Sequence, residues 1–254
     1  TAMIIDFPRE EHIPSLKALW KEAFGDTDAY LDLFFGTGYS PTRCRCVTEE
    51  GHVAAALYWL DLFCDGQKMA YIYAVATGKA YRGRGLCRML MEDTRNVLCG
   101  RGYYGAVLSP GDAGLARMYG TMGYSHCANI GQIRCQAGGK SVAIQRVSAE
   151  VYNAQRNLLL PEGGLELGKA AAGFLAAQAE LYVGENCTLA ALRTEQGLFG
   201  IELLGDPKLA PDILKTLDCE TGVFRIPFGD HPFAMFCPLK KKAKTPRYLG
   251  IAFD

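Results

Sequence analysis

The chain has 254 residues, 49% of them hydrophobic, and its 27 lysines and arginines balance its 27 aspartates and glutamates. This length suits one large domain or two small ones with packed cores. The balanced charge gives no net field that would draw the protein to nucleic acid or to an acidic membrane surface, and no run approaches the ~20 apolar residues of a transmembrane helix. We therefore predict no nucleic-acid partner and no membrane attachment.

Ten cysteines are scattered through mostly apolar runs, without CxxC pairs. Cysteine used as a small hydrophobe is typical of a reducing compartment. The closest pair, Cys44 and Cys46, has no histidine nearby at ligand spacing, so the sequence predicts no metal site. The first residues lack the basic and apolar regions of a signal peptide, and we expect a cytoplasmic protein.

The beginning of the chain predicts alternating helices and strands. The apolar stripe of an amphipathic helix is formed by Leu16, Leu19, Trp20, Ala23 and Phe24. Asp65-Gly66 is a strong hairpin signal. The expected elements, in order, are a strand (3–6), two helices (14–24 and 27–35) and three antiparallel strands (45–49, 52–63 and 67–75).

The rest of the chain is organised around a glycine-rich turn. A β-rich run, residues 71–75, leads into Tyr81-Arg82-Gly83-Arg84-Gly85-Leu86-Cys87, where a helix over 86–99 begins. Gly83 and Gly85 let the backbone approach a ligand closely. The free N–H groups and the dipole at the helix start favour an anion, and Arg82 and Arg84 add permanent positive charge. The pattern predicts a diphosphate-binding turn, although a plain strand-to-helix turn with exposed arginines has the same features.

The sequence after this turn also predicts helices and strands. Gly100 is expected to end the helix that the turn opens. A strand follows at 103–108, and Asp112 is an expected N-cap for a helix that carries Leu115, Met118 and Tyr119 and ends at Gly123. A strand at 131–136 is predicted to close the sheet.

Arg82, Gly85 and Cys87 fall on the Gln/Arg-x-x-Gly-x-Gly/Ala signature of the GNAT superfamily, the acyl-CoA-dependent N-acetyltransferases, which this stretch resembles. Cys87 departs from the pattern, which usually has glycine or alanine there, but cysteine is small enough for the turn. Residues 116–124 resemble the helix and the Gly-Tyr step that close the site in that family. The resemblance covers residues 3–136 as an order of elements and is specific over 71–124.

The resemblance implies an α+β GNAT fold, with a mixed, mostly antiparallel sheet flanked by helices. It implies acetyl-CoA as the acyl donor, no metal, and direct attack of a primary amine on the thioester in a ternary complex. The backbone of Val75, Ala76 and Thr77 would hold the pantetheine arm, and one N–H group would polarise the thioester carbonyl. The residues that would hold the rest of the cofactor are Arg82, Gly83, Arg84, Gly85, Leu86 and Cys87.

The resemblance makes Tyr119 the candidate general acid, which would protonate the departing CoA thiolate. Its spacing relative to Leu115 and Met122 alone favours a core tyrosine instead. Many family members place a glutamate, the general base, where Tyr71 stands here, and no carboxylate lies in that stretch. We expect Tyr71 on the acceptor side. The base stays open among Asp61, Asp112, His52 and His126, or a chain of water molecules.

The motifs stop near residue 137, so we predict a GNAT acetyltransferase domain over 1–137 and a degenerate GNAT-like α+β domain over 138–254. A turn at 194–197 echoes the one at 48–51, but the second half has no Arg-x-x-Gly-x-Gly pattern and no expected cofactor. Its expected elements are helices (148–158, 166–182 and 208–217) and strands (187–193, 198–204, 222–226, 232–237 and 247–253).

This plan resembles the first two domains of the enhanced-intracellular-survival type aminoglycoside acetyltransferases, in which a C-terminal carboxylate helps to deprotonate the amine. The resemblance implies that Asp254 faces the acceptor side; the alternative is a last strand that completes the second sheet. The acceptor stays open between small-molecule and peptide amines, and the oligomeric state is open too. A non-catalytic acyl-CoA-binding or regulatory module is the alternative function, because the strand carboxylate is missing.

Overall fold

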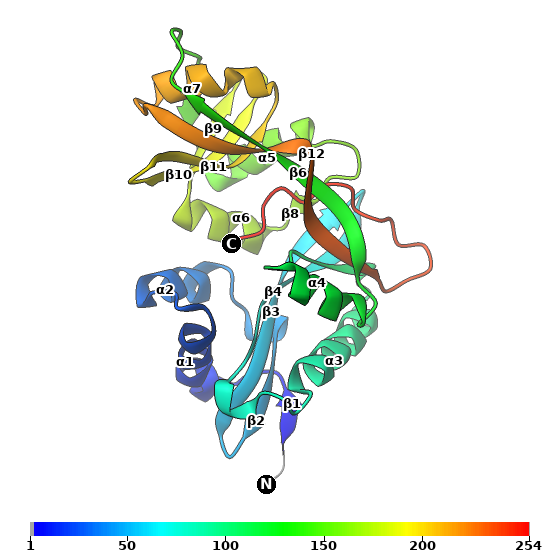
Figure 1. The fold of residues 1–254 in the computed structure, drawn as a ribbon. Helices are drawn as coiled ribbons and strands as arrows, with labels where there is room; N and C mark the ends of the chain where they lie inside the picture. Colours follow the sequence, from blue (N-terminus) through cyan, green and yellow to red (C-terminus); the bar gives the residue numbers. More distant parts are fainter. Residues whose placement is uncertain (1–2, 254) are drawn as a thin grey trace.

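Figure 1 shows the computed structural model, which describes residues 3–253. The chain forms two lobes, joined by two long strands that run from one lobe into the other. The first lobe begins with β1 (Ile4–Asp6), α1 (Ile13–Phe24), α2 (Asp28–Thr37), β2 (Cys44–Glu49), β3 (His52–Cys64) and β4 (Gln67–Thr77). It continues with α3 (Leu86–Gly100), β5 (Gly105–Leu108), α4 (Ala113–Gly120) and β6 (Ser125–Gln136).

Helices cover both faces of the sheet in this lobe, α1 and α2 on one face and α3 and α4 on the other (Figure 1). Most of the predicted stripe of α1 is buried, with Trp20 packed on Phe34 of α2 and Tyr58 of β3. Phe24, also expected in the stripe, is exposed at the end of the helix. On the other face Leu86 and Leu90 of α3 are buried against the sheet. This two-sided burial explains why β3, between the two layers, is an almost continuous apolar run.

Side chains cap α2 and α4 in the first lobe. The Thr27 hydroxyl accepts the backbone N–H of Tyr30 at 3.2 Å at the start of α2. As predicted, Asp112 caps α4, where its Oδ1 accepts the N–H of Leu115 at 2.8 Å. The cap fixes the start of α4, the helix that carries Tyr119.

The second lobe contains β7 (Ile144–Arg146), α5 (Ala149–Leu159), β8 (Glu166–Leu167), α6 (Lys169–Gln178), β9 (Glu180–Gly184), β10 (Thr188–Thr194), β11 (Gly197–Leu204), α7 (Ala210–Thr216) and β12 (Thr221–Pro238). The β10–β11 hairpin and the helices α5 and α7 agree with the sequence. The α+β class with a mixed, mostly antiparallel sheet is also as predicted.

The strands β6 and β12 make one sheet of both lobes, in the order β1-β2-β3-β4-β5-β12-β11-β10-β9-β7. They pair antiparallel with each other over most of their length, while β8 pairs with β3. On its other edge β12 pairs with β5 at Met235–Pro238 and with β11 at Gly222–Phe224. A strand from beyond residue 137 is thus part of the first lobe's sheet, and the division after residue 137 stays a prediction about the chain.

Several predicted boundaries were wrong. The strand expected at 131–136 begins at Ser125, and the two expected at 222–226 and 232–237 are one strand, β12. The bulges in the β6–β12 register, between Ile226 and His231 and beside Pro232, explain the apparent break. The helix expected over 166–182 is only α6, because the residues on either side of it pair in the sheet as β8 and β9.

Glycines near two helix ends also differ from the expectation. Gly100 is the last residue of α3, and the left-handed conformation belongs to Gly102, with φ of 81°. The α4 helix ends at Gly120, three residues before Gly123, whose φ is 93°. In both cases the chain makes one more turn after the helix before glycine reverses it.

The residues at 247–253 form no strand, which corrects the alternative of a last strand in the second sheet. This segment passes between the two lobes (Figure 1), and Leu249 and Ile251 are buried there. Only Tyr248 makes a bridge, to Gly164. Its alternating apolar sequence therefore reflects burial between two layers of the molecule rather than pairing at a sheet edge.

A fully buried ion pair holds this segment. Arg156 of α5 donates to Glu202 of β11 through Nε at 2.7 Å and Nη2 at 3.0 Å, and Tyr152 and Tyr248 donate their hydroxyls to the same carboxylate. Arg156 Nη2 also reaches the Leu249 carbonyl oxygen at 3.4 Å. Because nearly every polar atom of the pair has a partner, the cluster ties the segment to the second lobe.

Candidate active site

The predicted glycine-rich turn is present at the start of α3, and its role in anion binding stays a prediction. Gly83 and Gly85 have φ of 77° and 75°, a conformation that L side chains rarely adopt. The space that a Cβ atom would take at either glycine is open. Gly85 is the residue before α3, and Leu86 is buried beneath it. The turn therefore presents bare backbone and the N–H groups of a helix start to the solvent, as an anion site requires.

The arginines of the turn have different partners. Arg82 donates from Nε to the Thr77 carbonyl oxygen at 3.2 Å, which ties the turn to the end of β4. Arg84 makes two hydrogen bonds with Glu49 of β2, at 2.8 and 3.0 Å. These bonds lower the pKa of the Glu49 carboxyl, so Arg84 is partly neutralised at neutral pH. Arg82 has no carboxylate partner in residues 3–253 and brings the less compensated charge.

An opening between β4 and β5 leads to this turn. The two strands are parallel and pair only from Met69 to Tyr71 of β4. Ala74 has φ of 51°, and the register with β3 shifts beside it, which marks a bulge. Ala76 and Thr77 pair with β3 on one edge, and their other edge faces the opening. The backbone at residues 75–77, predicted to hold a pantetheine arm, therefore lies along an unpaired strand edge.

Tyr119 lies on α4 beside the cradle, by which we mean residues 82–87. Its side chain is 7% exposed, and its ring packs edge-on against Tyr124 with centroids 6.0 Å apart. Burial raises the pKa of Tyr119, and the nearby Cys87 thiol raises it further. The structure thus brings together Cys87 and Tyr119, and it keeps the phenol protonated at neutral pH.

A group of tyrosines beside β4 contacts the segment between the lobes. Tyr71 is buried and donates its hydroxyl to the Ala252 carbonyl oxygen at 2.5 Å. Tyr73 donates to the Phe253 carbonyl oxygen at 2.9 Å and shares a 2.6 Å hydrogen bond with Tyr30 of α2. Sequence analysis missed Tyr73, although its spacing of two from Tyr71 puts both rings on the same face of the strand. Asp254, the next residue, lies outside the described residues.

The four side chains considered as the base have other surroundings. Asp61 accepts the Tyr103 hydroxyl at 2.5 Å and pairs with Lys68 at 3.2 Å. Asp112 caps α4. His126 shares a hydrogen bond with Asn129, and His52 is exposed at the start of β3. None of the hydrogen bonds or ion pairs described for these four side chains involves the Tyr71 or Tyr73 hydroxyl.

Among residues 3–253 no group of three His, Cys, Asp or Glu side chains is placed to hold a metal ion. All ten cysteines are free thiols. Cys44 and Cys46 are buried side by side, and burial raises the pKa of Cys46 to about 11. Within the same residues no helix is long and apolar enough to cross a membrane.

Residues 5–127 match the family model described as the acetyltransferase (GNAT) domain. No curated protein matches the chain. A GCN5-related N-acetyltransferase from Anabaena variabilis has a similar structure, with a TM-score of 0.72 and 17% identity over 94% of this chain and 73% of that one. Eis1 from Mycobacterium abscessus gives a TM-score of 0.70 and 13% identity over 95% and 74%. At this identity the likeness establishes the fold, in both lobes.

Proposed function

We propose that the protein transfers an acetyl group from acetyl-CoA to a primary amine by direct attack within a ternary complex. The observation that carries the proposal is the opening between β4 and β5, which ends at the cradle. An unpaired strand edge followed by a helix start suits a ligand with an amide-containing arm and a diphosphate. The GNAT domain match over the same residues supports this ligand.

The cradle residues and β4 divide the binding of acetyl-CoA between them. Gly83 and Gly85 let the diphosphate approach the N–H groups of Leu86 and Cys87, and Arg82 adds charge. The backbone of residues 75–77 would pair with the pantetheine arm. An N–H group fixed on this strand would also stabilise the negative charge that develops on the thioester oxygen, because it needs no reorientation during the reaction.

Tyr119 is the proposed general acid. Its phenol is protonated at neutral pH because burial raises its pKa, and its position beside Cys87 supports a role close to the cradle. A group that protonates a leaving thiolate must hold its proton until the transition state, and a raised pKa serves this requirement. Tyr71, on the other face of the first lobe's sheet, is proposed to border the acceptor.

Asp254 is the proposed group that takes the proton from the acceptor amine. The two residues before it are tied by their carbonyl oxygens to Tyr71 and Tyr73 of β4, which supports a place for Asp254 near Tyr71, the residue proposed to border the acceptor. A carboxylate there would supply the charge that β4 itself lacks. Asp254→Asn should lower the rate most at neutral pH and least at alkaline pH, where the free amine needs no base. An unchanged pH–rate profile would remove the side-chain carboxylate of Asp254 from the mechanism, and an unchanged profile after deletion of the last two residues would remove the whole residue.

The test of the proposed function is CoA release from acetyl-CoA across a panel of small-molecule and peptide amines. Transfer should require the amine and produce the acetylated amine in equal amount, as mass spectrometry would show. Tight binding of acetyl-CoA with only solvent-level hydrolysis across the panel would instead favour the non-catalytic acyl-CoA-binding module. Failure to bind acetyl-CoA would contradict both.

A further inference from the structure

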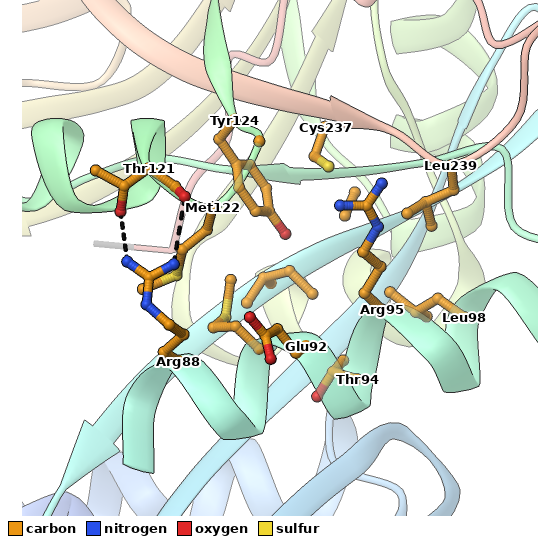
Figure 2. Close-up of a pocket in the computed structure, with 14 residues that line it drawn as sticks. Arg88, Glu92, Thr94, Arg95, Leu98, Thr121, Met122, Tyr124, Cys237 and Leu239 are labelled. Carbon is orange, nitrogen blue, oxygen red and sulfur yellow. Dashed lines mark hydrogen bonds between the residues drawn. The ribbon is translucent and has the colours of Figure 1, made fainter. Parts of the chain in front are cut away.

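A second pocket lies behind α3, away from the cradle. It encloses about 280 Å³ between the middle of α3, the turn after α4 and the end of β12 (Figure 2). Arg88 of α3 donates to the Thr121 hydroxyl at 2.7 Å and to the Thr121 carbonyl oxygen at 3.3 Å. These bonds join α3 to the turn after α4 at the end of the pocket that is nearer in sequence to the cradle.

The inner surface of this pocket is apolar. Ile72 and Ala106 come from adjacent strands of the sheet, and Leu98 and Leu239 line the end away from Arg88. Ile72, Leu98 and Ala106 are themselves buried. A branched aliphatic or a thioether side chain would find dispersion contacts there that water cannot make.

The mouth of the pocket is polar, and its groups lack partners. Tyr124 is only 8% exposed, yet among residues 3–253 its hydroxyl has no hydrogen-bond partner. Figure 2 shows this hydroxyl directed into the space between Glu92 and Arg95. Neither Glu92 nor Arg95 has an ion-pair partner within the described chain. The Tyr124 hydroxyl and the two charged groups therefore all face the pocket without a protein partner in the part of the chain that the structure describes, and are available to a ligand with complementary polar groups.

Arg95 lies at the mouth of the pocket, beside Gly123. Its Nη1 atom lies 3.6 Å from the place that a Cβ atom on Gly123 would take, and Cys237 Sγ lies 3.4 Å from the same place. The pKa of Tyr124 is raised by burial and by Cys237, and the positive charge of Arg95 opposes this shift. The guanidinium and the phenol both border the pocket (Figure 2), and Gly123 has no side chain to separate them.

We propose that this pocket binds a free α-amino acid with an apolar side chain. Arg95 and the Tyr124 hydroxyl would donate to the carboxylate, and Glu92 would accept from the ammonium group. The two opposite charges lie one helical turn apart on α3 and match the two charged groups of a zwitterion. A volume of about 280 Å³ equals roughly nine water molecules at 30 Å³ each, which suits a molecule of the size of leucine.

This site goes beyond the proposed transferase function, because it lies outside the cradle and the β4–β5 opening. It contains no group placed for acetyl transfer. The ligand is defined by three contacts together: a positive group, a negative group and an apolar cavity. A simple carboxylic acid or a simple amine would leave one of the two charges at the mouth without a partner.

Titration calorimetry with L-leucine, L-methionine and L-phenylalanine tests the proposal. L-leucine should bind, whereas 3-methylbutylamine and 4-methylpentanoate, which keep its skeleton but lack one charged group, should bind at least roughly tenfold more weakly, as expected for the loss of a charged hydrogen bond. Arg95→Met and Glu92→Gln should each weaken L-leucine binding by a similar factor. Both residues are exposed on α3, so the variants should fold.

Arg134→Met and Glu195→Gln are matched controls, since both residues are exposed in the second lobe, and these variants should bind L-leucine as the parent protein does. The proposal is overturned if none of the three amino acids binds. It is equally overturned if 3-methylbutylamine and 4-methylpentanoate bind as tightly as L-leucine. The same holds if Arg95→Met and Glu92→Gln both leave the affinity for L-leucine unchanged.

Discussion

The arginines of the cradle and Arg156 of the second lobe lie in opposite surroundings. Arg82 and Arg84 are exposed beside glycines whose backbone is bare. Arg156 is fully buried, and its guanidinium bonds to Glu202 and to the carbonyl oxygens of Leu165 and Leu249. The first arrangement leaves the backbone N–H groups of the helix start and part of the Arg82 guanidinium free, whereas the second uses nearly all donors of Arg156 within the fold.

This difference separates binding from architecture. Donors left free at a helix start can only lower the free energy when an anion arrives, so the cradle contributes little to folding. A buried ion pair is costly to desolvate and is stable only when both partners are present. The Arg156 cluster therefore acts on the fold, and through Tyr248 and Leu249 it also positions the segment that reaches Tyr71 and Tyr73.

The largest expected effect is on stability, from Arg156→Met. Removal of the guanidinium leaves the Glu202 carboxylate buried without a countercharge and should lower the free energy of unfolding by about 3–5 kcal/mol. Urea unfolding measures this. The double variant Arg156→Met/Glu202→Leu should recover part of the loss, because it removes the orphaned charge. A single variant as stable as the parent would show that the cluster does not hold the fold.

The next effect is on catalysis. Tyr119→Phe should lower kcat by roughly 10²-fold, the usual contribution of a general acid, with little change in the Kd of acetyl-CoA. Because burial raises the pKa of Tyr119, the acid form is kept at every pH below its ordinary value near 10, and ionisation of this phenol should cause no loss of rate between about pH 6 and 9. Tyr124→Phe, which changes the neighbouring buried ring, is the matched control. Parent-level turnover in Tyr119→Phe would make Tyr119 a core residue only.

Sequence analysis could predict the cradle because its signal is local. A glycine that must take a positive φ and an arginine three residues earlier are visible at fixed spacing, whatever the rest of the chain does. The same holds for the Asp112 cap and for most elements of the first lobe. Cys87, the departure from the family pattern, changes neither the turn nor the start of α3.

Long-range pairing could not be predicted in this way. Pro232 looks like a strand end, yet it lies within β12 because β6 follows the bend beside it. Tyr73 and Phe253 are 180 residues apart, and nothing in either stretch indicates that a hydroxyl of one meets a carbonyl of the other. An arginine at position 156 is expected on the surface of a helix, and it is buried only because α5 packs against β10. Each of these features depends on partners that only the folded chain brings together.

A smaller effect is expected on cofactor binding. Gly85→Asp places a carboxylate at the open helix start, where the diphosphate should lie, and should weaken acetyl-CoA binding by at least ~2 kcal/mol. Gly25→Asp is the matched control: Gly25 has a φ of 71° and open space at its Cβ position, but it ends α1. Calorimetry on both variants separates the loss of the site from backbone strain. Equal affinities in the two would remove the cradle from acetyl-CoA binding.

The smallest effect is expected for Arg84→Met, and it compares the exposed arginines of the cradle with the buried Arg156 most directly. Arg84→Met removes a charge that is paired with Glu49 at the surface, where solvent screens the pair. We expect no measurable change in the urea midpoint, in contrast to Arg156→Met.

Glu49 has a lowered pKa because of its hydrogen bonds to Arg84. Any contribution of the pair to stability is therefore present above the ordinary pKa of glutamate and is lost as the pH falls through the lowered value. Acetyl-CoA binding should weaken slightly in low salt and less in high salt, since the lost interaction is between exposed charges. A clear drop of the midpoint at neutral pH would mean that the cradle also supports the fold, and the division between the two groups of arginines would fail.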